Sequence, residues 1–293
     1  MDNENPVMTI RVDIDTWEGA NNGISAVIRA LEKHSDIKAS FLLTTGPDQT
    51  GRNIRRIFKT RDFSRLKLKA LKRFSLKNLA NSIILERKSL DKTHIDILQE
   101  ARQEGHEFGL HGFHHYLWVS YFQSLDVFQQ NLLLQKGIRH FQHILREKPK
   151  VFASPGFIWT KNLLRDLDRQ GFHCSSDFRL LKGTHAPFFV KFGNYTCSHL
   201  QIPVNYPLPY ELLLQGASEQ AIVRQIIKRT RELLKNSNFG GVFYVHAAVE
   251  PLHCFCLFDA ILSALEGVGV RFLTLSQIAK EFSNLAPTIS LAI

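Results

Sequence analysis

Short apolar segments alternate with amphipathic helical segments along most of the chain, and this alternation restricts the possible folds most strongly. The expected strands cover residues 8–15, 39–44, 107–110, 151–153, 199–204, 241–245 and 270–273. The expected helices cover residues 24–34, 95–103, 122–145, 162–170, 218–234 and 257–266. An α/β chain of this kind predicts a parallel sheet or a (β/α) barrel.

The composition fits one sizeable catalytic domain over residues 1–293, of which 44% are hydrophobic and 22% are charged. The polar N-terminal residues do not resemble a secretory signal, and no apolar run is as long as the roughly 18 residues of a membrane span. The four cysteines are Cys174, Cys197, Cys254 and Cys256, without a C-x-x-C motif. We therefore expect reduced thiols in a cytoplasmic protein.

Polar residues recur at the points where predicted strands end. They are Asp13, Asp15, His111, Asp177 and His246. In (β/α) barrels the active site lies at the carboxyl ends of the strands. Five such placements favour a catalytic site over the alternative of solvated aspartates and a histidine-rich loop.

Asp13 and Asp15, together with the motif from His111 to His115, form a set of potential metal ligands. Zinc and similar divalent ions bind imidazole nitrogen and carboxylate oxygen, and a catalytic site leaves one position open for water. The pattern therefore predicts metal-assisted hydrolysis. Since the residues alone do not assign the two aspartates, either Asp13 or Asp15 could be the base.

The order of these motifs resembles the polysaccharide deacetylase superfamily. The resemblance rests on Asp13-Ile14-Asp15, Gly46-Pro47-Asp48, His111 with His114-His115, Pro155-Gly156-Phe157, Ser175-Ser176-Asp177 and Val245-His246-Ala247. It implies a distorted (β/α) barrel of about seven strands that removes acyl groups from sugars with one divalent metal ion, namely Zn, Mn, Co or Ni. Within the superfamily, the chain is most similar to enzymes that deformylate 4-deoxy-4-formamido-L-arabinose on undecaprenyl phosphate, in lipid A modification.

The resemblance also implies roles for the residues of the site. Asp13 would be the general base, and Asp15, His111 and His115 would bind the metal ion. His246 would be the general acid.

Two further roles would support these residues. Asp177 would pair with His246 and hold it protonated. A backbone N–H near Phe157 would stabilise the oxyanion.

The chain departs from the common pattern of the superfamily in two places. Ala153-Ser154 stand where an arginine usually steadies the base, and Arg179 could take that role instead. One residue separates Asp13 from Asp15, whereas the two aspartates are usually adjacent. The deformylase-like members share this spacing.

Residues 52–92 form a basic amphipathic insertion. Its part from Arg52 to Lys77 contains eleven Lys or Arg residues and one acid, Asp62, so its net charge of +10 equals that of the whole chain. Such a segment suits an anionic membrane surface, and Arg52 could contact a lipid phosphate. A solvated helical face is the alternative. We expect no nucleic-acid partner, because no matching motif accompanies the charge.

Three functions remain open from the sequence. The first is a deformylase or deacetylase of a lipid-linked amino sugar, peripheral on the inner face of the inner membrane, with Glu250 and Gln201 as further substrate contacts. The second is the same chemistry on another lipid-linked sugar or on a polymeric N-acetyl sugar. The third is a membrane-docking protein without activity.

Overall fold

The computed structural model describes residues 5–34, 37–48, 92–182 and 185–291. The predicted insertion at residues 52–92 therefore lies outside the described residues, apart from Lys92, which begins helix α5. Arg52 lies outside them as well. None of the described helices combines the length and the apolar character needed to cross a membrane.

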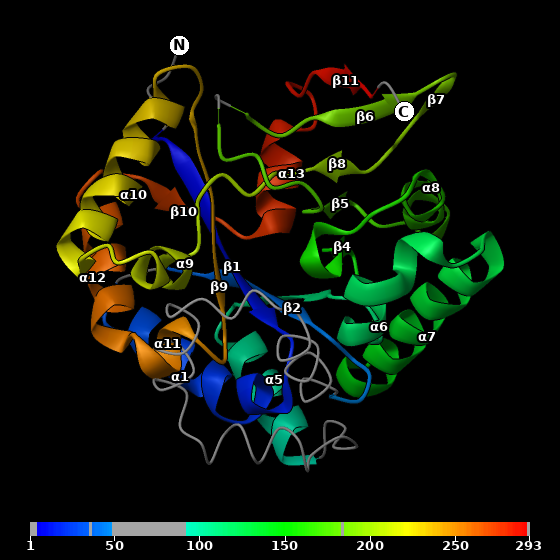
Figure 1. Ribbon diagram of the computed structural model, residues 1–293, viewed down its shortest axis with the longest axis horizontal. Coiled ribbons are helices and arrows are strands. Elements are labelled where there is room, and N and C mark those ends of the chain that lie inside the picture. The colour runs from blue at the N-terminus through cyan, green and yellow to red at the C-terminus, as the bar shows by residue number, and fades with distance from the viewer. Residues whose placement is uncertain (1–4, 35–36, 49–91, 183–184, 292–293) are drawn as a thin grey trace.

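Parallel strands form the central sheet. They are β1 (Val7–Ile14), β2 (Ala39–Leu43), β3 (Glu107–Leu110), β4 (Val151–Phe152), β5 (Cys174–Ser175), β8 (Leu200–Gln201), β9 (Phe239–His246) and β10 (Arg271–Phe272). Seven of them lie in the order β9-β1-β2-β3-β4-β5-β8, and β10 pairs with the first residues of β1. A single bridge between Val204 and Val242 links the segment after β8 to β9. The predicted distorted barrel of about seven strands is confirmed (Figure 1).

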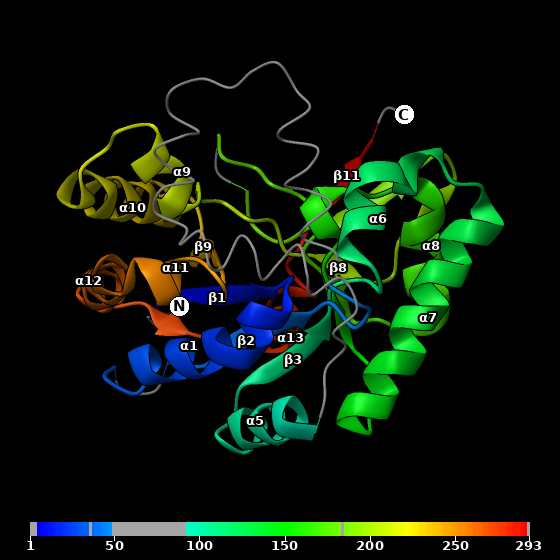
Figure 2. The same cartoon turned by 60° about the horizontal axis from the view of Figure 1, so that its bottom comes forward.

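Helices cover the outside of this sheet (Figure 2). They are α1 (Ile24–Leu31), α5 (Lys92–Gln103), α6 (His115–Tyr121), α7 (Val127–Leu145), α8 (Lys161–Gln170), α9 (Pro209–Leu214), α10 (Glu219–Leu234), α11 (Glu250–His253), α12 (Phe255–Glu266) and α13 (Leu275–Phe282). The helix expected over residues 122–145 begins only at Val127. Asp126 caps the start of this helix. Its side chain accepts from the backbone N–H of Gln129, and the Gln129 side chain accepts from the backbone N–H of Asp126.

Strand β1 lies at the centre of the sheet, between β2 and β9, and all eight of its residues are buried. Successive side chains of a strand point to opposite faces. Ile10, Val12 and Ile14 therefore join the main apolar core. Arg11 and Asp13 point to the other face, which leads to the site described below.

Helix α13 packs at the opposite end of the barrel from the carboxyl ends of the strands. The N–H of Leu275 donates to Ser40 Oγ at the start of β2, and the N–H of Ser276 donates to Glu107 at the start of β3. The chain then pairs β11 (Thr288–Ser290) with β6 (Phe189–Phe192), next to β7 (Tyr195–Thr196). The sequence patterns did not predict this small second sheet.

Candidate metal centre and hydrolytic site

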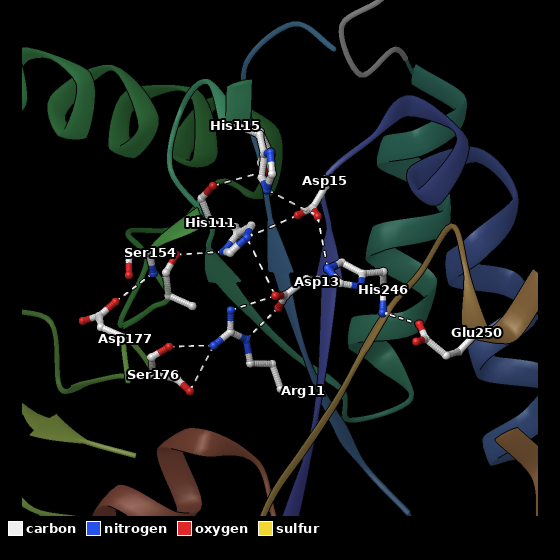
Figure 3. Close-up of polar contacts among 12 residues, drawn as sticks. Arg11, Asp13, Asp15, His111, His115, Ser154, Ser176, Asp177, His246 and Glu250 are labelled. Carbon is white, nitrogen blue, oxygen red and sulfur yellow. Dashed lines mark hydrogen bonds and ion pairs between the residues drawn. The ribbon is translucent and has the colours of Figure 1, made fainter. Parts of the chain in front are cut away.

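The carboxyl ends of β1, β3 and β9 bring four predicted site residues together. Asp13 lies near the end of β1 and Asp15 follows it, while His111 follows β3 and His246 is the last residue of β9. His115 begins α6, four residues after His111. Figure 3 shows the three histidine rings directed toward the two carboxylates.

Asp15, His111 and His115 form the candidate metal centre, with one ligand atom from each within 4.8 Å of the others. Asp15 Oδ1 lies 3.2 Å from His111 Nε2, and Asp15 Oδ2 lies 3.4 Å from His115 Nε2. Ligand atoms around one tetrahedral zinc ion lie about 3.3 Å apart, given bonds of about 2.0–2.1 Å. The spacing therefore suits a small divalent ion.

The hydrogen bonds of this centre also fit a metal ion. His111 Nδ1 lies 2.8 Å from the carbonyl oxygen of Ala153, which fixes the proton on Nδ1 and leaves Nε2 to bind a metal. Asp15 Oδ1 is buried and forms no hydrogen bond with the described residues. A buried oxygen without a donor is costly, and a cation would satisfy it.

Electrostatics within the cluster act in the same direction. Burial works to raise the pKa of Asp15, but the neighbouring His115 and His111 outweigh burial and hold this pKa well below its ordinary value. Burial lowers the pKa of His115 more than the nearby carboxylates raise it. A carboxylate and a neutral imidazole are the forms that bind metal.

Arg11 is the site residue that the sequence analysis missed. Its Nε and Nη2 atoms donate to the two oxygens of Asp13, at 2.6 and 2.7 Å, and its Nη1 donates to the carbonyl oxygen of Ser176 at 2.6 Å. The guanidinium is fully buried and also lies over the ring of Phe157. Arg11, and not Arg179, therefore contacts Asp13, whereas Arg179 pairs with Glu211. The period of two along β1 places Arg11 and Asp13 on one face, and this signal could have revealed the pair.

His246 lies on the other side of the aspartates. Its Nε2 is 3.6 Å from Asp15 Oδ2, and its backbone N–H donates to Glu250. Burial works to lower the pKa of His246, but Asp15, Glu250 and Asp13 together outweigh burial and raise it. A histidine of this kind is suited to donate a proton.

Asp177 does not pair with His246, contrary to the prediction. Its Oδ1 accepts from the N–H of Ser154 at 2.7 Å, and its Oδ2 accepts from Ser175 Oγ at 2.7 Å and from Gln201 at 3.2 Å. Figure 3 shows Asp177 and His246 on opposite sides of Asp13. Asp177 instead holds the backbone of Ser154 in place. The residue before it, Ala153, has the carbonyl that orients His111.

Gln201 and Glu250 were predicted to contact substrate, but both are fully buried. Gln201 donates to Ser175 Oγ and also to Asp177. Glu250 accepts from the backbone N–H groups of His246 and Tyr210. Both residues therefore support other parts of the site.

The oxyanion role expected near Phe157 also changes. The N–H of Phe157 already donates to the carbonyl of Ser154, in a turn where Phe157 has a positive φ of 58°. Its ring packs beside Arg11 and Tyr244. Phe157 thus supports the Arg11–Asp13 pair rather than offering a free N–H.

A cavity of about 270 Å³ opens onto the site. It is lined by Asp13, Asp15, Thr16, Leu208, Tyr210, Glu211, His246, Ala248 and Val249. Arg179 forms a two-pronged ion pair with Glu211 beside this cavity. Tyr210 and Glu211 come from α9, which the sequence patterns did not predict.

Comparisons with known proteins identify the family of this chain. Residues 4–175 match the profile of the polysaccharide deacetylase family. Two proteins assigned as 4-deoxy-4-formamido-L-arabinose-phosphoundecaprenol deformylases are similar over most of their length. The protein of Shewanella sediminis is 26% identical over 92% of this chain and 84% of its own, and that of Wigglesworthia glossinidia brevipalpis is 28% identical over 91% of each.

Solved structures share the fold at low sequence identity. A protein described as a polysaccharide deacetylase from Mycobacterium smegmatis superposes with a TM-score of 0.66 at 12% identity, covering 100% of this chain and 96% of its own. A family 4 acetyl xylan esterase from Clostridium thermocellum, solved with a cobalt ion, gives 0.55 at 12% identity, covering 98% and 100%. The chain therefore belongs to the polysaccharide deacetylase family and is a hydrolase that acts on amides.

Proposed function

We propose that this protein removes a formyl or acetyl group from an amino sugar carried on undecaprenyl phosphate, as a step in lipid A modification. The observation that carries the chemistry is the group of Asp13, Asp15 and His246 around one cavity, next to His111 and His115. The two deformylase relatives, which match nearly the whole chain, support the substrate.

Asp15, His111 and His115 would hold one divalent ion, which is Zn, Mn, Co or Ni. When bound, such an ion polarises the amide carbonyl and lowers the pKa of a bound water. The buried Asp15 Oδ1 without a hydrogen bond is the observation that favours this ligand set.

Asp13 is the proposed base, which removes a proton from the attacking water. The resulting hydroxide adds to the carbonyl carbon. Arg11 holds both oxygens of Asp13 in a fixed plane, so that the base is oriented before the water arrives. This division of roles fits the geometry better than the reverse, because Asp15 and not Asp13 contacts both histidines most closely.

His246 is the proposed acid. As the bond between the carbonyl carbon and the nitrogen breaks, His246 donates a proton to the departing amine, and the products are formate or acetate and the free amino sugar. His246 lines the cavity beside Asp15, within reach of a substrate bound there.

The size of the cavity favours one sugar over a polymer. Its volume of about 270 Å³ is slightly below the roughly 300–1,000 Å³ of most ligand pockets. The ion pair of Arg179 with Glu211 lies beside the cavity and would offer hydrogen bonds to sugar hydroxyls.

A lipid-linked substrate would place the enzyme on the inner face of the inner membrane, where Arg52 would contact lipid phosphate.

The test is product analysis. Purified protein is incubated with undecaprenyl-phosphate-linked formamido-arabinose in detergent, with and without a chelator, and formate is measured. An N-acetyl-sugar lipid is assayed in parallel for acetate. We expect chelator-sensitive formate release. Acetate from the second lipid alone would change the substrate, and no release from either would contradict the proposal.

A further inference from the structure

Four exposed apolar side chains lie close together in the chain around the start of α7. Tyr121 is 51% exposed, Val127 55%, Phe128 76% and Leu132 38%. They are four of the six large apolar side chains that are exposed within the described part of the chain. Single exposed apolar residues are ordinary, but a cluster marks an interaction surface. We call these four residues the rim patch.

The rim patch lies at the same end of the barrel as the hydrolytic site. Strand β3 delivers His111, and α6 begins at the metal-ligand candidate His115 and ends at Tyr121. Because β3 and β4 are parallel, α7 must run from the carboxyl end of β3 back to the start of β4. The first turn of α7, with Val127 and Phe128, is therefore at the site end. Figures 1 and 2 show α6 beside α7 in both views.

The outward face of α7 changes from apolar to cationic along its length. Phe128, Leu132, Lys136 and Arg139 are all exposed and follow one another at helical spacings of three or four residues. Helix α7 contains no Asp or Glu between Val127 and Leu145. Its other face is buried, with Leu134 and Phe141 in the core.

This combination has the chemistry of a surface that binds anionic lipid. Aromatic and aliphatic side chains enter the boundary between headgroups and acyl chains, and nearby Lys and Arg contact the phosphate groups. One exposed acid, Asp126, caps the start of α7, and its carboxylate accepts from the N–H of Gln129. Beyond it, the outward face of α7 carries Lys136 and Arg139 and no acid, so its charge complements an anionic bilayer.

We propose that the rim patch docks the protein on an anionic bilayer and so holds the mouth of the site close to the membrane. The docking would present a lipid-linked sugar to Asp13 and His246, and this consequence rests on the proposed function. The binding of the patch to lipid does not depend on it. The contact is separate from the predicted role of the basic segment at residues 52–92.

The experiment is sedimentation of the full chain with phosphatidylcholine vesicles, with and without phosphatidylglycerol. The variant Phe128→Ser/Leu132→Ser should partition to anionic vesicles roughly tenfold less than the parent, because it lacks two apolar side chains that would be buried. Lys136→Glu/Arg139→Glu should lose on the order of tenfold, and only with phosphatidylglycerol. Leu285→Ser is the matched control, since Leu285 is 76% exposed and follows α13 at the other end of the barrel.

Three further measurements keep the result interpretable. Thermal unfolding should show that the Phe128→Ser/Leu132→Ser variant remains folded, since Phe128 is 76% and Leu132 38% exposed. Phe128→Trp should show fluorescence quenched by brominated lipid beyond that of the parent. Asp15→Ala should bind vesicles as the parent does, so a failure of the proposed activity would leave this result intact.

Equal vesicle binding by the Phe128→Ser/Leu132→Ser variant and the parent would overturn the proposal, as would an equal loss in Leu285→Ser. Light scattering that showed a dimer abolished by the same double variant, with vesicle binding retained, would also overturn it. The patch would then join two copies of the chain.

Discussion

Two clusters in this protein contain similar potential metal ligands, but their surroundings differ. Asp15, His111 and His115 form one, and Asp168, Cys197 and His199 form the other. In the first, Asp15 Oδ1 is buried without a hydrogen bond to any described residue. In the second, Asp168 Oδ1 accepts from the N–H and Oγ of Ser198 and from the N–H and Nδ1 of His199.

The clusters also differ in one ligand, because the second contains Cys197 where the first has a second histidine. Burial, followed by the charge of Asp168, raises the pKa of the Cys197 thiol to about 12, so at neutral pH the thiol keeps its proton. Metals bind the thiolate. The comparison shows that residue types and spacing alone do not identify a metal centre. An unsatisfied oxygen and ligands in the correct protonation state distinguish the candidate site from a structural network.

The largest effect is expected from Asp15→Asn. This change removes the carboxylate charge from the ligand set and should abolish both stoichiometric metal binding and hydrolysis. The expected loss of activity is at least about a thousandfold, because the metal ion supplies several kcal/mol of transition-state stabilisation. Metal content by elemental analysis and turnover are measured together. A variant that keeps its metal and full activity would refute the assignment.

Asp13→Asn should separate catalysis from metal binding. Because Asp13 is proposed as the base and not as a ligand, the variant should retain its metal while activity falls roughly a hundredfold to ten-thousandfold. The matched comparison is Asp15→Asn in the same metal assay. Loss of metal in both variants would mean that the two aspartates share the ion.

Asp177→Asn should have an intermediate effect. The change weakens the bond from the N–H of Ser154, next to the carbonyl of Ala153 that orients His111. Loss of such an outer partner commonly costs about 10–100-fold in metal affinity or activity. Metal titration reports this directly, and an unchanged metal affinity would show that Asp177 has a purely structural role.

Asp168→Asn should lower stability without lowering activity per bound metal. Burial works to raise the pKa of Asp168, but hydrogen bonds from His199, Tyr195 and Ser198 hold it below its ordinary value. A lowered folded-state pKa contributes stability that is complete above the ordinary value of about 4 and is lost as the pH falls further.

The variant should therefore unfold about 1–3 kcal/mol more easily at pH 7, and the difference should shrink below about pH 4. Urea titrations at several pH values measure this change. A difference that grew on acidification would contradict the sign.

The smallest effect is expected from Cys197→Ser. The thiol stays protonated and lies beside a carboxylate that already has its donors, so metal stoichiometry and turnover should match those of the parent. A lower metal content in this variant would assign a second metal centre to the Asp168 cluster.

Much of the barrel and the position of the site could be predicted from the sequence. Apolar segments ending in Asp13, His111 and His246 locate three strands and the edge where they meet, because parallel strands end on one side. The seven predicted strands are confirmed as β1, β2, β3, β4, β8, β9 and β10, although β4, β8 and β10 are only two residues long. Strand β5, which precedes Asp177, was not predicted. Helix α9, which supplies Glu211 to the cavity, was missed because it is only six residues long.

The partners of the site residues were harder to predict. The sequence places Asp177 at a strand end, but its carboxylate is held by a backbone N–H and by Gln201, and no side-chain pattern reveals such bonds. Arg11 was missed because its partners, Asp13 and the carbonyl of Ser176, come together only in the fold. Its alternation with Asp13 on β1 was nevertheless visible.

The most direct test of the account is the position of the metal ion. Crystals grown with zinc or cobalt, measured at the absorption edge of the metal, would locate it by anomalous diffraction. We predict one peak bounded by Asp15, His111 and His115. A peak at Asp168, Cys197 and His199, or no peak at the first cluster in crystals of active protein, would contradict the account.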